Sequence, residues 1–317
     1  MGEIDDDDCD ETDAQYREQL DRAETYRWDG IAAKLRAAGP PPRTLAKTPV
    51  ILETPFASDP GHLLALLCAA ASDDLALVVT NDADDHATRY ARYVLDLAGR
   101  DDVPVVAQAQ RRKLHRAFDN DGRPAPPIEG PSADVLAAVR KMCASTSAAV
   151  RWIGTGCPTT LAHVLNEDMQ VRERLAVTQS DNGFARDPVG AAKVIETVED
   201  LLLVRSETVT DATITVHQKL WAAACCAPVA SELEAYLDRW PANPVCSALP
   251  VATTAAGLLM PSAEFTRRQV VVNDSGQINI DPANGHRRWI TMQVNDVDLW
   301  LGKQLARLPI PRERSRP

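Results

Sequence analysis

Several common features are missing from this sequence of 317 residues. No apolar run is long enough to cross a lipid bilayer, and the N-terminus has no apolar segment of the kind found in signal peptides. The seven cysteines form no CxxC pair, and the adjacent Cys225 and Cys226 suit neither a routine disulfide nor a zinc site. We therefore expect a cytoplasmic protein with reduced cysteines and no membrane partner.

Clustered positive charge is also scarce. The formal net charge is −11, and much of the acidic excess lies in the N-terminal stretch "EIDDDDCDETD". A block of like charges is usually a solvated tail. Binding to a phosphate backbone needs clustered Lys and Arg, and only two short basic stretches, 111–116 and 312–317, offer any. We therefore expect no nucleic acid as a partner.

The composition is that of a globular protein, because 45 % of the residues are hydrophobic, enough for one large core or two modest ones. Residues 1–45 combine the acidic tail with a segment whose apolar residues recur at every third or fourth position, and Gly39 and three prolines end it. We predict an acidic, helical N-terminal extension there. Residues 46–317 are predicted to form the main domain.

Strand-like and helix-like segments alternate through much of this domain. Apolar runs typical of buried strands occupy 48–53, 75–80, 103–108, 148–154, 174–180 and 200–207. Helix-like segments lie between or after them, at 61–73, 84–99, 133–145, 158–168 and 187–198. Helical stretches at 214–240 and 248–261 precede two final strand-like runs, 267–274 and 287–294. The pattern predicts an α/β fold, with a mostly parallel central sheet flanked by helices and a small C-terminal β addition.

Polar residues follow several of the predicted strands. In such sheets, ligands bind beyond the carboxyl ends of the strands, so these residues are the candidates for a binding site. They are Glu53, Asp59, Asn81, Asp82, Thr155, Asp181, Asn182, Thr210 and Asp211. Each of them could instead cap a helix or stabilise a turn, as Asp59 could before Pro60 and Gly61.

The stretch "GTG" at 154–156 follows a predicted strand and is similar to the glycine motif of S-adenosylmethionine-dependent methyltransferases. Glycines in that motif let the backbone approach the cofactor. The stretch is short, however, and it follows three earlier strands, whereas the methyltransferase motif usually opens the sheet. No acidic residue ends the next strand. The methyltransferase is therefore the less favoured interpretation.

A second resemblance extends over residues 47–310. The run "TPVILETPFASDPGHLLALLCAAASDDLALVVTN", followed by "VLDLAGR" and "VPVV", resembles the opening of the nucleoside hydrolases. The segments "GTGCPTTLAHVLNED", "DNGFARDPVGAAKVI" and "TVTDAT" resemble later segments of that family, and the C-terminal strands and helix resemble its closing elements. The order and spacing of these segments identify the chain as a divergent relative of the inosine-uridine preferring N-ribohydrolases.

The resemblance implies a chemistry as well as a fold. In the family, an aspartate cluster and a later aspartate hold a calcium ion, together with a main-chain carbonyl of a threonine. The ion binds the ribose diol and a water, and one aspartate acts as the base on that water. Calcium prefers six to eight oxygen ligands and makes a bound water easier to deprotonate. An oxocarbenium-like transition state also gains from nearby negative charge.

This chain departs from the family at that cluster. Read without gaps, Glu53 and Asp59 take the first and third aspartates, and prolines take the others. An alignment on "DPG" places Leu63 and Leu64 at two aspartate positions. An alignment counted back from Ser72 places Gly61 and His62 at two of them. No register retains a complete calcium site. The resemblance implies that Asp59 is the catalytic base and that the doubtful metal ligands are Glu53, Asp59 and Thr155.

The remaining site residues also follow from the resemblance. The predicted ligand-binding residues are Asn81, Asp82, Asp181, Asn182 and His62. The expected partner is a nucleoside or another ribosyl small molecule, and the expected assembly is a homo-oligomer. Two functions stay open: cleavage of an N-glycosidic bond, with calcium as a possible cofactor, and a role as a binding or scaffold protein for a pseudoenzyme that has lost catalysis.

Overall fold

A computed structural model describes residues 48–55, 60–80, 86–107, 134–209, 213–215, 245–258, 263–295, 297–305 and 307–308. The predicted helical extension at 1–45 lies outside these residues. Within them, nine strands form one sheet in the order β10-β9-β11-β6-β5-β4-β1-β2-β3. The sheet strands are β1 (Val50–Thr54), β2 (Leu75–Thr80), β3 (Val105–Ala107), β4 (Val150–Gly154), β5 (Leu175–Ser180), β6 (Leu201–Val204), β9 (Ala263–Val272), β10 (Ile278–Ile280) and β11 (His286–Val294).

The sheet is mostly parallel. Strands β1 to β6 pair with one another in parallel, and β11 continues the sheet in parallel beside β6. Strand β9 then runs antiparallel to β11, and β10 runs antiparallel to β9. The prediction of a parallel sheet with a C-terminal β addition is confirmed. Every residue of β1, β4 and β5 is buried, which explains why these strands do not alternate between apolar and polar residues.

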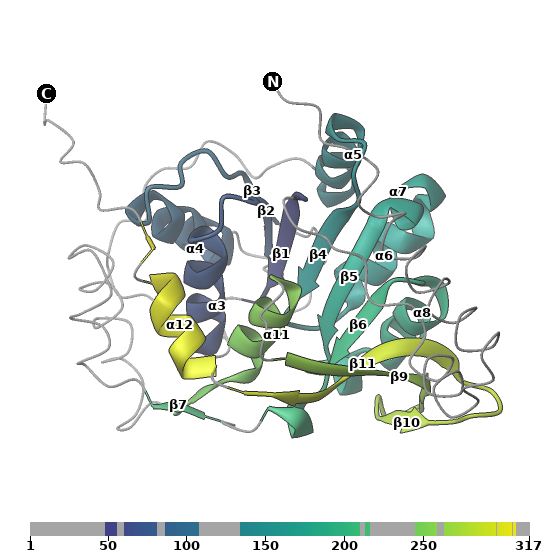
Figure 1. Ribbon diagram of the computed structural model, residues 1–317. Coiled ribbons are helices and arrows are strands. Elements are labelled where there is room, and N and C mark those ends of the chain that lie inside the picture. Colours follow the sequence, from purple (N-terminus) through teal and green to yellow (C-terminus); the bar gives the residue numbers. More distant parts are fainter. Residues whose placement is uncertain are drawn as a thin grey trace, which may run out of the picture.

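Helices cover both faces of the sheet (Figure 1). One apolar cluster joins the sheet to α3 (Pro60–Ala70), α4 (His86–Leu97), α11 (Leu249–Gly257) and α12 (Val297–Leu305). The other cluster joins the opposite face to α5 (Val135–Ser145), α6 (Thr159–Glu167), α7 (Met169–Arg174) and α8 (Pro188–Thr197). No helix among the described residues is both long enough and apolar enough to span a membrane.

Four elements, α7, β7 (Thr213–Thr215), β8 (Val245–Ser247) and β10, differ from the prediction. Helix α7 was not predicted. It begins directly after the predicted helix at 158–168, because the Asp168 side chain accepts hydrogen bonds from the backbone N–H groups of Gln170 and Val171. Strand β7 overlaps the start of a segment predicted to be helical, and it pairs with β8. Its β-branched residues favour the extended form. Strand β10 was not predicted, because it has only three residues.

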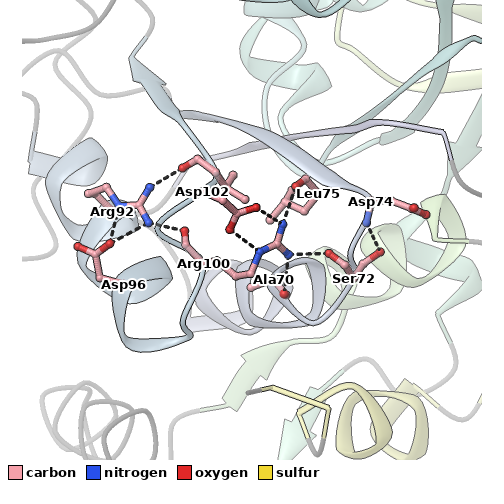
Figure 2. Close-up of polar contacts among 9 residues, drawn as sticks. Ala70, Ser72, Asp74, Leu75, Arg92, Asp96, Arg100 and Asp102 are labelled. Atoms are coloured by element: carbon pink, nitrogen blue, oxygen red, sulfur yellow. Dashed lines mark hydrogen bonds and ion pairs between the residues drawn. The ribbon is translucent and has the colours of Figure 1, made fainter. Parts of the chain in front are cut away.

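An arginine brace lies at the amino-terminal end of β2 (Figure 2). Arg100 donates hydrogen bonds to the carbonyl oxygens of Ala70, Ser72 and Leu75, at 2.7–2.9 Å. These carbonyls belong to the end of α3, the following turn and the start of β2. Hydrogen bonds from Arg100 to Asp102 lower the pKa of that carboxyl. Arg100 therefore fixes the connection between α3 and β2, at the opposite end of the sheet from the predicted site.

Candidate functional site

The order in which strands are added to the sheet changes side between β1 and β4. From β1 the chain proceeds to β2 and β3 on one side, and then returns to β4, β5 and β6 on the other. At such a switch point, the connections that follow the two strands diverge and leave room for a ligand beyond their carboxyl ends. The residues at the ends of β1, β4 and β5 therefore form the candidate site.

Glu53 is fully buried near the end of β1. It pairs with Gly154 of β4 and lies on the same face of the strand as Ile51, which packs in the cluster with α5, α6 and α8. The Trp152 indole Nε1 donates a hydrogen bond to Glu53 Oε2 at 3.2 Å. This contact directs the carboxylate toward the α5–α8 side of the sheet.

Thr155 links the ends of β1 and β4. Its backbone N–H and its hydroxyl both donate to the Glu53 carbonyl oxygen, at 3.0 and 3.1 Å. The hydroxyl oxygen also lies 3.1 Å from Nδ1 of His62, in the first turn of α3. Thr155 is fully buried. Sequence reasoning assigned a role only to its backbone, and the structure adds a role for its side chain.

The protonation of His62 follows from these contacts. The Glu53 carbonyl can only accept, so the single Thr155 hydroxyl proton points to it, and His62 Nδ1 must then donate to Thr155 Oγ1. His62 is 1 % exposed, and this burial, assisted by the nearby positive charge of Arg186, lowers its pKa to about 3. His62 is therefore a neutral imidazole with its proton on Nδ1.

Gln179, one residue before the end of β5, lies over Gly154. A Cβ at Gly154 would be 1.9 Å from Gln179 Oε1, so only glycine leaves room for the amide. Gln179 Nε2 donates to the carbonyl oxygens of Gly156 and Ser180, at 2.8 and 3.2 Å. A Cβ at Gly156 would meet the Pro55 ring at 2.6 Å. Packing therefore accounts for both glycines of "GTG", which were the basis of the methyltransferase interpretation.

Asp181 lies just beyond β5, two strands from β1. Its carboxylate accepts hydrogen bonds from the backbone N–H of Ser206 at 3.0 and 3.1 Å and from the Ser206 hydroxyl at 3.1 Å. Burial raises the pKa of Asp181, against the opposing effect of these donors. Ser206 begins the short 3-10 helix η2 (Ser206–Thr208) after β6. The half-buried Asn182 follows Asp181, and Gly183 then turns the chain with a φ of 87°.

The structure thus brings Glu53, His62 and Thr155 together, and it places Asp181 and Asn182 further along the same edge. Asp59, Asn81 and Asp82 lie outside the described residues, so their roles stay predictions. Sequence reasoning missed Thr54, Gln179 and Ser180, which are all fully buried at the ends of their strands. Their position at a strand end next to a candidate residue was the available signal.

The residues of this edge offer few of the oxygen ligands that a calcium site needs. Calcium requires six to eight oxygen ligands, most of them from carboxylates, carbonyls and water. Across the described ranges, no three His, Cys, Asp or Glu side chains are grouped so that they could hold a metal. The Glu53 carboxylate accepts from Trp152, and His62 offers an imidazole rather than an oxygen. These residues do not fit a calcium ion.

Comparisons with known proteins identify the fold. No family model and no curated protein matches the sequence. An inosine-uridine preferring nucleoside hydrolase from Bacillus anthracis superposes with a TM-score of 0.66 and 15 % identity, over 82 % of this chain and 99 % of that one. A plant nucleoside hydrolase gives 0.64 and 15 %, over 82 % and 99 %. An inosine-guanosine nucleoside hydrolase gives 0.66 and 13 %, over 83 % and 98 %. The chain therefore has a nucleoside-hydrolase-like fold.

Proposed function

We propose that this protein binds a ribosyl or nucleoside-type small molecule at the carboxyl ends of β1, β4 and β5, without a calcium ion. One observation supports this proposal most directly: buried polar side chains are concentrated at the switch point of a nucleoside-hydrolase-like sheet. Burying polar groups costs free energy unless they are satisfied, so their concentration at one edge favours a binding role.

Binding without hydrolysis is the form of the proposal that the described residues favour. Hydrolysis by the calcium mechanism needs several carboxylates around the metal and a base on the attacking water. Of the carboxylates implied by the resemblance, Glu53 accepts from the Trp152 indole, and Asp181 accepts from Ser206. The protein would then be a pseudoenzyme that retains the fold and a ligand site.

Cleavage of an N-glycosidic bond is the second candidate. It would require Asp59 as the base, with Asn81 and Asp82 on the sugar, and calcium would have to find most of its ligands outside the described residues. The similarity of the fold to that of nucleoside hydrolases supports this second candidate. We also propose, from the same resemblance, that the protein is a homo-oligomer, which sedimentation of the full chain would test. From the cysteine pattern we propose that it is cytoplasmic, which cell fractionation would test.

The experiment is a titration of the full chain with ribose, inosine, guanosine and uridine by calorimetry. Each titration is made once with a chelator and once with millimolar calcium, and release of free base is followed by chromatography. We expect saturable binding of at least one of these compounds, equal in both conditions and without base release. The proposed function would be refuted if none of the four compounds bound in either condition, or if binding appeared only with calcium.

A further inference from the structure

Hydroxyl side chains form a row across four adjacent strands at the candidate site. The register pairs Thr54 of β1 with Thr80 of β2. Gly154 of β4 pairs with Glu53 of β1 and with Gln179 of β5. The residues that follow these three, Thr155, Thr54 and Ser180, therefore lie at one level. In parallel strands, paired residues point to the same face, so the four hydroxyls share one level of the sheet. All four side chains are 0 % exposed.

The row lies on the face covered by α3 and α11. Two residues back along each strand, Leu52 and Val78 belong to the apolar cluster that includes these helices. The hydrogen bond from His62, at the start of α3, to Thr155 Oγ1 places the histidine on the same face. The Glu53 carboxylate alternates to the opposite face, where Trp152 binds it. The side chains that contact the row, Thr88 and His62, are therefore uncharged, and the positive charge of Arg186 lies near His62.

The four hydroxyls differ in how they are satisfied. Thr80 Oγ1 lies 2.7 Å from Thr88 Oγ1, and Thr155 Oγ1 contacts the Glu53 carbonyl and His62. Within the part of the chain that the structure describes, Thr54 Oγ1 and Ser180 Oγ are buried without a hydrogen-bond partner. A buried hydroxyl without a partner costs about 1–3 kcal/mol, so two of them flanking one central residue call for an explanation.

We propose that Thr54 and Ser180 are ligand-contacting residues, and that they bind hydroxyl groups of an uncharged sugar directly, with no metal ion between them. This inference rests on the proposed function and identifies the residues and the ligand chemistry of that site. Thr54 and Ser180 lie on either side of Thr155, so their strands are separated by about 9–10 Å. That separation suits a molecule of the size of a ribosyl unit better than a single ion.

The chemistry of the row determines the class of ligand. A hydroxyl both donates and accepts a hydrogen bond, which matches the hydroxyl groups of a sugar. A divalent cation would need carboxylates at this level, and an anion would need N–H groups or positive charge. The imidazole of His62 is neutral, and among the described residues neither Arg186 nor any other charged group hydrogen-bonds the four hydroxyls directly. His62 and Thr155 act as positioning residues, since their mutual hydrogen bond fixes the centre of the row.

The test uses Thr54→Val and Ser180→Ala in the full chain, because both changes delete a hydroxyl with little loss of volume. Two properties are measured: the thermal midpoint without ligand, and the affinity for inosine with a chelator present. A buried hydroxyl that only a ligand can hydrogen-bond lowers the stability of the ligand-free protein. We therefore expect each variant to melt at or above the wild-type midpoint and to bind inosine about five- to thirtyfold more weakly.

Two matched controls come from the same face of the sheet. Thr80→Val removes a hydroxyl that has the Thr88 hydroxyl as its partner, so its midpoint should fall. Thr178→Val changes a buried residue two positions before Ser180, one level further from the edge, and should keep the wild-type affinity.

The outcomes separate this inference from the proposed function. If the wild type binds none of ribose, inosine, guanosine and uridine, the proposed function fails, and the inference fails with it. If the wild type binds inosine and both variants bind it equally well, only the inference is refuted. It is also refuted if both variants lose as much thermal stability as Thr80→Val. In that case, the two hydroxyls have a structural partner, such as an ordered water.

Discussion

The buried His62 should make folding stability depend on pH in a way that a single substitution removes. An ordinary histidine has a pKa of 6.5, and burial lowers that of His62 to about 3. Between these two values, the unfolded chain binds a proton that the folded chain does not. The free energy of unfolding must therefore fall as the pH falls from about 6.5 toward 3, and it should not depend on His62 above that window.

The size of the effect follows from the shift. One proton contributes about 1.4 kcal/mol for each pH unit within the window, so lowering the pH from 6.5 to 4.5 should cost about 2.5 kcal/mol through His62. Other titrating groups add their own pH dependence to the wild type. That contribution cancels when the wild type is compared with His62→Gln, whose amide can still donate to Thr155 Oγ1.

The assay is urea unfolding of the wild type, His62→Gln and the control His163→Gln at several pH values from 7.5 to about 4.5, the range set by the ordinary histidine pKa. His163 is exposed on α6. We expect the wild type and His163→Gln to lose stability in parallel, and His62→Gln to lose about 2.5 kcal/mol less over the window. Equal losses in all three proteins would refute the buried, neutral state of His62.

Three further predictions concern contacts around the sheet. Arg100→Ala should lower the free energy of unfolding by about 3 kcal/mol in urea unfolding, because three carbonyls lose a charged donor, and Arg100→Lys should restore less than half of it. Gly154→Ala should cost about 2 kcal/mol, since its Cβ would collide with Gln179, and adding Gln179→Ala should recover part of that loss. Ser206→Ala removes a donor to the Asp181 carboxylate, so it should raise the pKa of Asp181 further in a carboxyl NMR titration, and an unchanged pKa would contradict the contact.

Much of the fold could be predicted, because its signals are local. The continuous apolar runs at 75–80 and 174–180 became β2 and β5 with almost unchanged limits. Parallel pairing followed from the helices between the strands. The short helix α7 and the three-residue β10 were missed, because so few residues carry little periodicity.

The site was harder to predict, because its contacts join residues that are far apart in the sequence. The sequence indicated that Thr155 and His62 belong to the site, but it did not indicate that their side chains meet across 93 positions. Thr54 and Ser180 were overlooked, since their alignment depends on the register of strands separated by more than a hundred residues. The contact between Glu53 and Trp152 likewise depends on which face of the sheet each strand presents.

Calorimetric titration of the wild-type full chain with inosine in the presence of a chelator tests the central claim most directly. We expect saturable binding that added calcium does not strengthen, with no hypoxanthine released. The central claim would be contradicted by inosine binding that appears only when calcium is added, or by the release of free base.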